Sequence, residues 1–178
     1  VSVEQGFDPR DFALIAFGGA GPLHANALGK LMGAWPVIIP PSPGVLCAYG
    51  DATTRVTDEA SRSVVRQFSE ITKVSVGEIL NELEARAHTE LDAEGVPRAE
   101  QSVSYEVDLR YHGQGLQLPV SFIAEEFKKE GLYLLRRKFD DMHTQLFTFA
   151  LDAEHEIVTL RAIVQGSETL VAAGTMPE

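Results

Sequence analysis

The chain has 178 residues, a formal net charge of −11 at pH 7 and 44% hydrophobic residues. This composition predicts a folded globular protein of one or two domains, since a domain takes roughly 100 to 200 residues. Nucleic-acid and anionic membrane surfaces need clustered Lys and Arg, which are scattered here, and no apolar run approaches the roughly 20 residues that span a bilayer. We therefore expect a cytoplasmic protein that binds neither nucleic acid nor membrane.

A glycine-rich turn follows the first apolar run of the chain. Residues 14–17 are typical of a short buried strand, and Gly18, Gly19 and Gly21 then end it. Pro22 suits the first turn of a helix, and the unpaired amides of a helix N-terminus stabilise a phosphate or a polar ribose edge. The turn therefore predicts a nucleotide-binding loop. Close packing of a helix on a sheet is the alternative reason for such glycines, because the phosphate-loop and dinucleotide fingerprints are both absent.

The first 60 residues predict a strand–helix–strand–helix unit. The helix that begins at Pro22 ends at Gly33, residues 37–39 form a second buried strand, and another helix begins near Val45. The apolar face of the first helix comprises Leu23, Ala27, Leu28 and Leu31. Such a unit implies a parallel sheet, and ligands bind at the carboxyl ends of parallel strands. Loop 40–44 and the glycine turn both fall there, so we expect them to share one cleft.

The single tryptophan and the single cysteine of the chain, Trp35 and Cys47, both lie in this region. Trp35 is expected to pack against the preceding helix, with a contact to another molecule as the alternative. Cys47 is the single cysteine, which excludes an internal disulfide and metal sites built on paired cysteines. We expect it to be a small buried hydrophobic residue.

Residues 61–170 predict a separate α+β module. Residues 61–68 are typical of a connecting strand, and capping-box spacing at Ser75 indicates a helix that ends at Gly95. Its buried face is predicted to comprise Val76, Ile79, Leu80, Leu83, Ala87 and Leu91. Residues 102–122 alternate between apolar and polar on both sides of a glycine turn, which predicts a β-hairpin.

The rest of this module predicts a long helix and a last strand. Apolar residues three and four apart predict an amphipathic helix over residues 130–147. The last strand is expected at residues 156–164, and residues 171–178 are expected to form a tail.

The polar residues form no catalytic or metal-binding pattern. The histidines lack ligand spacing, so we expect no metal site and place four of them on the surface: His88, His112, His143 and His155. Arg110 and Gln114 lie on the polar side of the hairpin, where they could bind a partner or a substrate carboxylate or simply form an exposed strand face. Asp140 and Asp141 are expected to be solvated, and no nucleophile is assigned.

Several motifs in order resemble the C-terminal part of the hydantoinase A and oxoprolinase family. Three of them lie in the first unit, at residues 6–12, 16–25 and 40–45. Two more, at residues 108–114 and 157–161, look like later signatures of the family. The stretch Ala-Phe-Gly-Gly-Ala-Gly-Pro-Leu-His-Ala at residues 16–25 is the most specific of the five.

The resemblance implies an α/β unit followed by an α+β domain. Residues 1–60 would form the end of an actin-like ATPase lobe of the sugar-kinase type, and residues 61–170 the family's C-terminal domain. The adenosine side of ATP would contact Gly18, Gly19, Ala20 and Gly21, and His24 would lie beside it. The family's phosphate loops and acidic Mg²⁺ ligands lie upstream of the matching motifs, so we expect the chain to be a fragment that is inactive alone.

The activity that the resemblance implies is cleavage of a cyclic amide, a hydantoin or 5-oxoproline, driven by ATP hydrolysis. A ring amide is a poor electrophile, and phosphorylation of its oxygen would create a leaving group before water attacks. A hydantoinase B-like subunit or domain is the expected partner, and a homo-oligomer is also expected. The alternatives are the ATP-dependent activating subunit of a ketone carboxylase and a noncatalytic module that docks a partner subunit.

Overall fold

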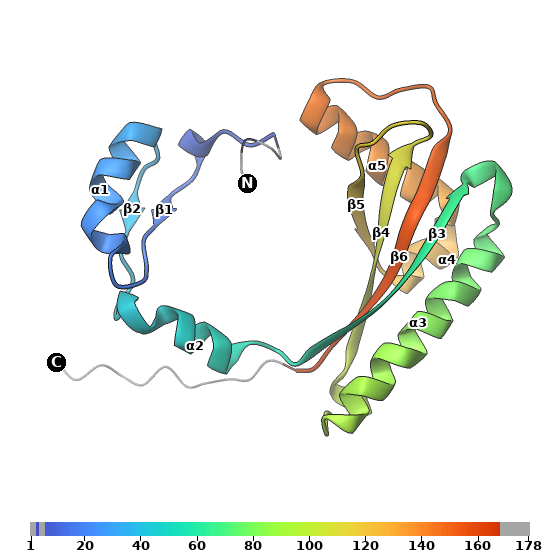
Figure 1. Cartoon of the computed structure of the whole chain (residues 1–178), viewed down its shortest axis with the longest axis horizontal. Coiled ribbons are helices and arrows are strands. Elements are labelled where there is room, and N and C mark those ends of the chain that lie inside the picture. The colour runs from blue at the N-terminus through green and yellow to red at the C-terminus, as the bar shows by residue number, and fades with distance from the viewer. Residues whose placement is uncertain (1–2, 4–5, 168–178) are drawn as a thin grey trace. The chain divides into compact units, whose positions relative to one another are not determined.

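The chain forms two compact units, which divide between Thr54 and Arg55. The structure is a computed structural model that describes residue 3 and residues 6–167 (Figure 1). The boundary that we predicted after residue 60 lies inside strand β3, which begins at Thr57. The predicted tail, residues 171–178, lies outside the described residues. No helix among the described residues is long and apolar enough to cross a membrane.

The first unit contains the predicted strand–helix–strand–helix order. Its elements are η2 (Pro9–Asp11), β1 (Leu14–Ile15), α1 (Gly21–Met32), β2 (Val37–Ile38), η3 (Pro43–Val45) and α2 (Leu46–Thr53). Strands β1 and β2 pair in parallel, with Leu14 opposite Val37 and Ile15 opposite Ile38. The predicted parallel pairing is confirmed.

Two glycines fix helix α1 against strand β2. Gly33 ends α1 in the left-handed conformation, with φ of 69°, and its amide donates to the Gly29 carbonyl, as the C-cap prediction requires. A Cβ atom on Gly29 would lie only 2.5 Å from Cγ2 of Val37. Glycine at position 29 therefore allows the helix to approach the strand closely.

The apolar face predicted for α1 is exposed in the structure. Leu23 and Leu31 are 81% and 84% exposed, whereas Ala25 and Gly29 are the buried residues of α1. Close approach to a two-stranded sheet selects the smallest side chains for the contact, so the large apolar residues lie on other sides of the helix. The predicted packing of Trp35 and burial of Cys47 are also wrong, since Trp35 is 76% exposed and Cys47 is exposed.

The second unit is built on a four-stranded antiparallel sheet. Its strands are β3 (Thr57–Gln67), β4 (Ser102–Tyr111), β5 (Leu118–Phe122) and β6 (His155–Gln165), arranged in the order β3-β6-β4-β5. The helices are α3 (Lys73–Ala93), α4 (Ala124–Glu130) and α5 (Leu132–Phe147), with short turns η4 (Phe68–Glu70) and η5 (Arg98–Glu100). The last strand, β6, pairs along its length with both β3 and β4.

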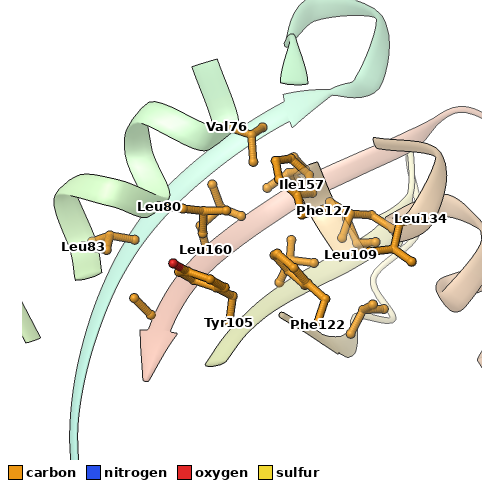
Figure 2. Packing of buried hydrophobic residues seen from close by; sticks show 14 of the residues in the cluster. Val76, Leu80, Leu83, Tyr105, Leu109, Phe122, Phe127, Leu134, Ile157 and Leu160 are labelled. Atoms are coloured by element: carbon orange, nitrogen blue, oxygen red, sulfur yellow. The ribbon is translucent and has the colours of Figure 1, made fainter. Parts of the chain in front are cut away.

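One face of this sheet and the three helices enclose a single hydrophobic core. Every second residue of β4 from Tyr105 to Tyr111 is buried, and the same alternation runs through β5. The close-up in Figure 2 shows Val76, Leu80 and Leu83 of α3 packing over this face. The predicted hairpin and most of the predicted face of the first long helix are confirmed, although Ile79 is only half-buried.

The helix boundaries differ from the predicted ones at two places. Helix α3 is capped by Thr72, and Ser75 is the third helical residue of that capping box, so the helix begins before the predicted Ser75. The predicted helix 130–147 is α5 and begins at Leu132, after a break at Gly131, whose φ is 63°. The buried residues of α5 are Leu134, Leu135, Phe139 and His143. Helix α4, before the break, has no counterpart in the sequence-based prediction.

The packing of the core predicts that alanine substitutions at two leucines of the second unit have very different effects on stability. Leu160→Ala should lower the free energy of unfolding by about 2–5 kcal/mol, because Leu160 is fully buried and its loss leaves a cavity. Leu116→Ala is the matched control, because Leu116 is exposed. This substitution should change the free energy of unfolding by less than about 0.5 kcal/mol. Urea denaturation followed by circular dichroism measures both. Equal losses in the two variants would contradict this packing.

Candidate functional site

The glycine turn lies beside loop 40–44. The amides of Leu14 and Ala16 donate to the carbonyls of Pro36 and Ile38, and beyond this ladder the Gly18 amide donates to the Pro43 carbonyl over 2.8 Å. Both loops follow the carboxyl ends of parallel strands, β1 and β2. This hydrogen bond holds the two loops side by side, and the shared cleft that we expected stays a prediction.

The backbone of this turn is free to meet a ligand. Gly18 has a φ of 85°, which favours glycine, and a Cβ atom on Gly18 or Gly19 would have no neighbour within 4 Å. Within the described residues, the amides of Gly19, Ala20 and Gly21 donate to no backbone carbonyl, and Ala20 caps α1 without a side-chain hydrogen bond. Unpaired amides at the positive end of a helix suit an anion or a polar ribose edge. Contact of these residues with a nucleotide stays a prediction.

His24 lies one turn into α1, and its side chain is exposed. Its ring makes no hydrogen bond or ion pair with any other described residue. The described part of the chain also contains no group of three His, Cys, Asp or Glu side chains that could hold a metal ion. The turn therefore offers backbone amides and one exposed imidazole, and no acidic ligand set for Mg²⁺.

Three of the histidines that we expected on the surface are buried: His88, His143 and His155. His155 Nε2 lies 2.8 Å from Oδ1 of Asp140, and the same oxygen accepts the hydroxyl of Tyr111 at 2.7 Å. Burial and the Asp140 carboxylate raise the pKa of Tyr111 to about 12, although the Leu151 amide opposes this by donating to its hydroxyl. Tyr111 therefore stays protonated and donates to Asp140.

This buried network was missed by the sequence analysis. Tyr111 lies at the end of β4, Asp140 in α5 and His155 at the start of β6, so the three residues meet only after the sheet has formed. Asp140 is half-buried in this contact, so its predicted solvation is wrong. The remaining histidine, His112, is exposed as predicted. No spacing in the sequence indicates these pairings.

Arg110 is held in an ion pair on the open face of the sheet. Its Nε lies 2.5 Å from Oε2 of Glu156, and His112 Nδ1 lies 3.4 Å from the other oxygen of this buried carboxylate. Arg110 is therefore half-buried and ion-paired, so the exposed strand face is not observed, and binding of a partner or a substrate carboxylate stays a prediction. Gln114 is half-buried in the hairpin turn, where its backbone amide donates to the backbone carbonyl of Tyr111.

A second set of charges on this face centres on Arg161 of β6. Its guanidinium donates to both oxygens of Asp108 at 2.5 and 2.9 Å and to Oε1 of Glu106 at 2.7 Å. Oε1 of Glu59, on β3, lies 3.2 Å from Nε of Arg161. The Asp108 and Glu106 carboxylates raise the pKa of Arg161, against the effect of its partial burial. These contacts tie three strands together through their polar face.

Comparison with known proteins gives both a family and relatives for this chain. Residues 1–60 match the family described as hydantoinase/oxoprolinase. An uncharacterized protein of Methanocaldococcus jannaschii is 31% identical over 167 residues, which are 93% of this chain and 23% of that protein. The caprolactamase alpha subunit of Pseudomonas jessenii is 31% identical over 84% of this chain and 22% of its own length. The chain thus spans about a quarter of the length of these relatives.

Two further matches extend the comparison. The crystal structure of the ATP-dependent caprolactamase from Pseudomonas jessenii matches this chain with a TM-score of 0.82 and 28% identity. The match covers 93% of this chain and 24% of the caprolactamase chain. The acetophenone carboxylase gamma subunit of Aromatoleum aromaticum is 35% identical over 62% of this chain and 16% of that protein. The mixed α/β fold described above is therefore shared with the caprolactamase.

The Arg110–Glu156 pair predicts a pH-dependent contribution to stability. Although burial opposes it, hydrogen bonds and charge from Arg110 and His112 hold the pKa of Glu156 below its usual 4.5. A carboxyl whose folded pKa is lowered stabilises the fold above its unfolded pKa, and this stabilisation is lost as the pH falls through the folded value. Glu156→Gln should therefore cost about 1–3 kcal/mol at pH 7 and progressively less as the pH falls below 4.5.

Urea denaturation over this pH range measures the effect. Glu94→Gln is the control, because Glu94 is exposed and its side chain pairs with no other described residue. A cost of Glu156→Gln that stays constant across the pH range would contradict the assigned ion pair.

Proposed function

Because this chain belongs to the hydantoinase/oxoprolinase family, we propose that it is part of an ATP-dependent enzyme that opens a cyclic amide. Its similarity to the ATP-dependent caprolactamase over most of its length supports this proposal, since a lactam is an amide closed into a ring. Hydantoin and 5-oxoproline, the substrates implied by the motifs, contain the same kind of bond. ATP would phosphorylate the amide oxygen and so make the ring carbon electrophilic to water. Collapse of the water adduct would break the C–N bond and release the ring nitrogen as a protonated amine, and hydrolysis of the remaining acyl phosphate would give the carboxylate and phosphate.

The first unit would contribute the adenosine side of the nucleotide site, as the end of an actin-like ATPase lobe. The observation that carries this role is the bond from the Gly18 amide to the Pro43 carbonyl, because it joins the two loops at the carboxyl ends of β1 and β2. The free amides of Gly19, Ala20 and Gly21 would then donate to the nucleotide, with His24 nearby on α1. We assign Mg²⁺ and the phosphates to other parts of a longer protein, since the described residues offer no acidic ligand set.

The second unit would serve assembly. Its core and ion-paired strands form a self-contained module, and its described residues include no cluster suited to metal catalysis. The names of two relatives support a multisubunit enzyme, since one is an alpha subunit and the other a gamma subunit. We propose a hydantoinase B-like subunit or domain as the partner, and a homo-oligomer is compatible with this arrangement.

An activating subunit of a ketone carboxylase is the second candidate function. The observation that favours it is the 35% identity to the acetophenone carboxylase gamma subunit. Both candidates use ATP to activate a carbonyl oxygen, so the same glycine turn would serve either reaction.

Gly19→Val tests the nucleotide site. In the full-length protein, this variant should raise the Kd for ATP about tenfold or more, because a side chain would fill the open space through which a ligand reaches the backbone. Calorimetry measures the Kd, and the isolated chain should bind ATP weakly or not at all. Gly115→Val is the matched control, since Gly115 also has open space around its Cβ position but lies in the hairpin turn. Unchanged ATP affinity in Gly19→Val would refute the assignment.

A substrate panel distinguishes the two candidate enzymes. Phosphate release by the full-length protein should rise with cyclic amides, tested as hydantoin, 5-oxoproline and caprolactam, and not with acetone or acetophenone. A cyclic-amide hydrolase couples ATP cleavage to the ring bond, so open-chain amides of the same size serve as the control. Stimulation by the ketones alone would favour the carboxylase function.

A further inference from the structure

Strand β3 forms one long edge of the sheet in the second unit. The sheet has the order β3-β6-β4-β5, so its edge strands are β3 and β5 (Figure 1). The β5 edge is only five residues long and is blocked, because Pro119 has no amide hydrogen and the Lys138 ammonium donates to the Ser121 carbonyl at 3.0 Å. The β3 edge is 11 residues long. It is therefore the edge of this sheet at which another strand could add.

The backbone groups on the outer side of β3 are unpaired. The Gly166 amide donates to the Val56 carbonyl, so in this antiparallel register the even-numbered residues of β3 exchange hydrogen bonds with β6. The odd-numbered residues from Thr57 to Ser63 therefore point their amides and carbonyls outward. Within the part of the chain that the structure describes, no donor or acceptor meets these groups, and the side chains of the same residues are exposed.

A bulge sets the length of this open edge. The pairing of β3 with β6 shifts between Ser63 and Arg66, and Val65 at this shift is left-handed, with a φ of 47°. A bulge bends its strand and interrupts regular pairing. The regular part of the edge therefore runs over residues 57–63, and its midpoint is Ala60.

This stretch is complementary to a second copy of itself. When two copies of residues 57–63 pair antiparallel with Ala60 on the two-fold axis, every outward-pointing residue lies opposite an outward-pointing residue of the other copy. Asp58 then lies opposite Arg62 of the second copy, and the symmetry repeats this pair. Opposite charges directly across two strands stabilise the pairing. The charges on the β3 edge therefore favour this register.

A polar hollow beside the edge suits the arginine of the second copy. It has a volume of about 290 Å³ and lies between β3 and α3. Its lining comprises Asp58, Glu59, Ala60, Arg86, Thr89 and Glu90. Glu59 already pairs with Arg161. Asp58 and Glu90 form no ion pair with any described residue and outnumber Arg86, so the hollow offers carboxylate oxygens to a guanidinium.

Arg62 lies on the same face of the sheet as this hollow. Its Nη2 donates to Oε1 of Glu82 on α3 at 2.5 Å, and Asp58 also faces α3, since it lines the hollow. The Arg62 side chain is 37% exposed, and its guanidinium has further N–H donors that Glu82 does not use. Arg62 is thus able to keep its contact with Glu82 and donate to Asp58 of a second copy.

We propose that two copies of this chain associate through the β3 edge, with residues 57–63 paired antiparallel about Ala60. The two sheets would join into one continuous sheet, and Arg62 of each copy would lie against Asp58 of the other, in the polar hollow. Main-chain hydrogen bonds would supply the affinity of this contact, and the two charge pairs would fix its register. The proposal does not depend on the nucleotide site of the first unit.

Sedimentation equilibrium of the full chain tests the association and gives its Kd. We expect the mass of two chains of 19.4 kDa each at high concentration, in the presence of a reductant because Cys47 is exposed. Ser61→Pro removes an outward amide hydrogen and no bond to β6, so it should raise the Kd about tenfold or more. Ser61→Ala is the matched control, because it keeps this amide, and should leave the Kd within about twofold.

Charge reversals test the register. Asp58→Arg and Arg62→Glu each place like charges opposite one another, so each should raise the Kd about tenfold or more. The double variant restores opposite charges and should bring the Kd back to within several-fold of the unaltered value. Within one chain the two residues lie about 13 Å apart along the strand, at roughly 3.3 Å per residue, so this recovery requires contact between copies.

Two outcomes would overturn the proposal. One is a chain that keeps the mass of a single copy at every concentration. The other is association that Ser61→Pro and the single charge reversals leave unchanged, which would assign the contact to another surface, such as the exposed Leu23 and Trp35 of the first unit. If Ser61→Pro loses the circular dichroism of the folded chain, the charge reversals and their double variant decide the question.

Discussion

The second unit depends on the insertion of its last strand, β6, between β3 and β4. This pairing brings both Thr57 of β3 and Ser102 of β4 opposite Gln165, so the first and last strands of the module pair directly with each other. Closing so long a stretch of chain costs conformational entropy, which the burial of residues such as Ile157 and Leu160 offsets. The ion pairs of Arg161 and the buried contacts of His155 exist only because β6 occupies this place.

The two units use their apolar residues in opposite ways. In the second unit, the apolar residues that alternate along the strands pack against the helices in one core. The polar residues on the other face of the sheet form ion pairs with one another. In the first unit, Leu23, Leu31 and Trp35 are exposed, while the contact between α1 and β2 is made by small residues. The candidate nucleotide loop thus lies in the part that buries the least, where free backbone amides are available to a ligand.

The features predicted correctly from the sequence are local ones. Period-two alternation located the hairpin, and glycine and proline placed the ends of α1, because these signals depend on neighbours along the chain. The proximity of Gly18 to loop 40–44 also followed from local order, since consecutive parallel strands carry their loops to the same edge. The burial of His155 and the exposure of Leu23 could not be predicted, because each depends on which distant surface packs against the residue.

The central place of β6 also has a consequence for biosynthesis. A ribosome makes β3, α3 and the β4–β5 hairpin before β6, so the facing edges of β3 and β4 have no partner until the chain reaches Gln165. Unpaired strand edges readily pair with other chains. During translation, this module therefore passes through a stage in which two strand edges are exposed to pairing with other chains.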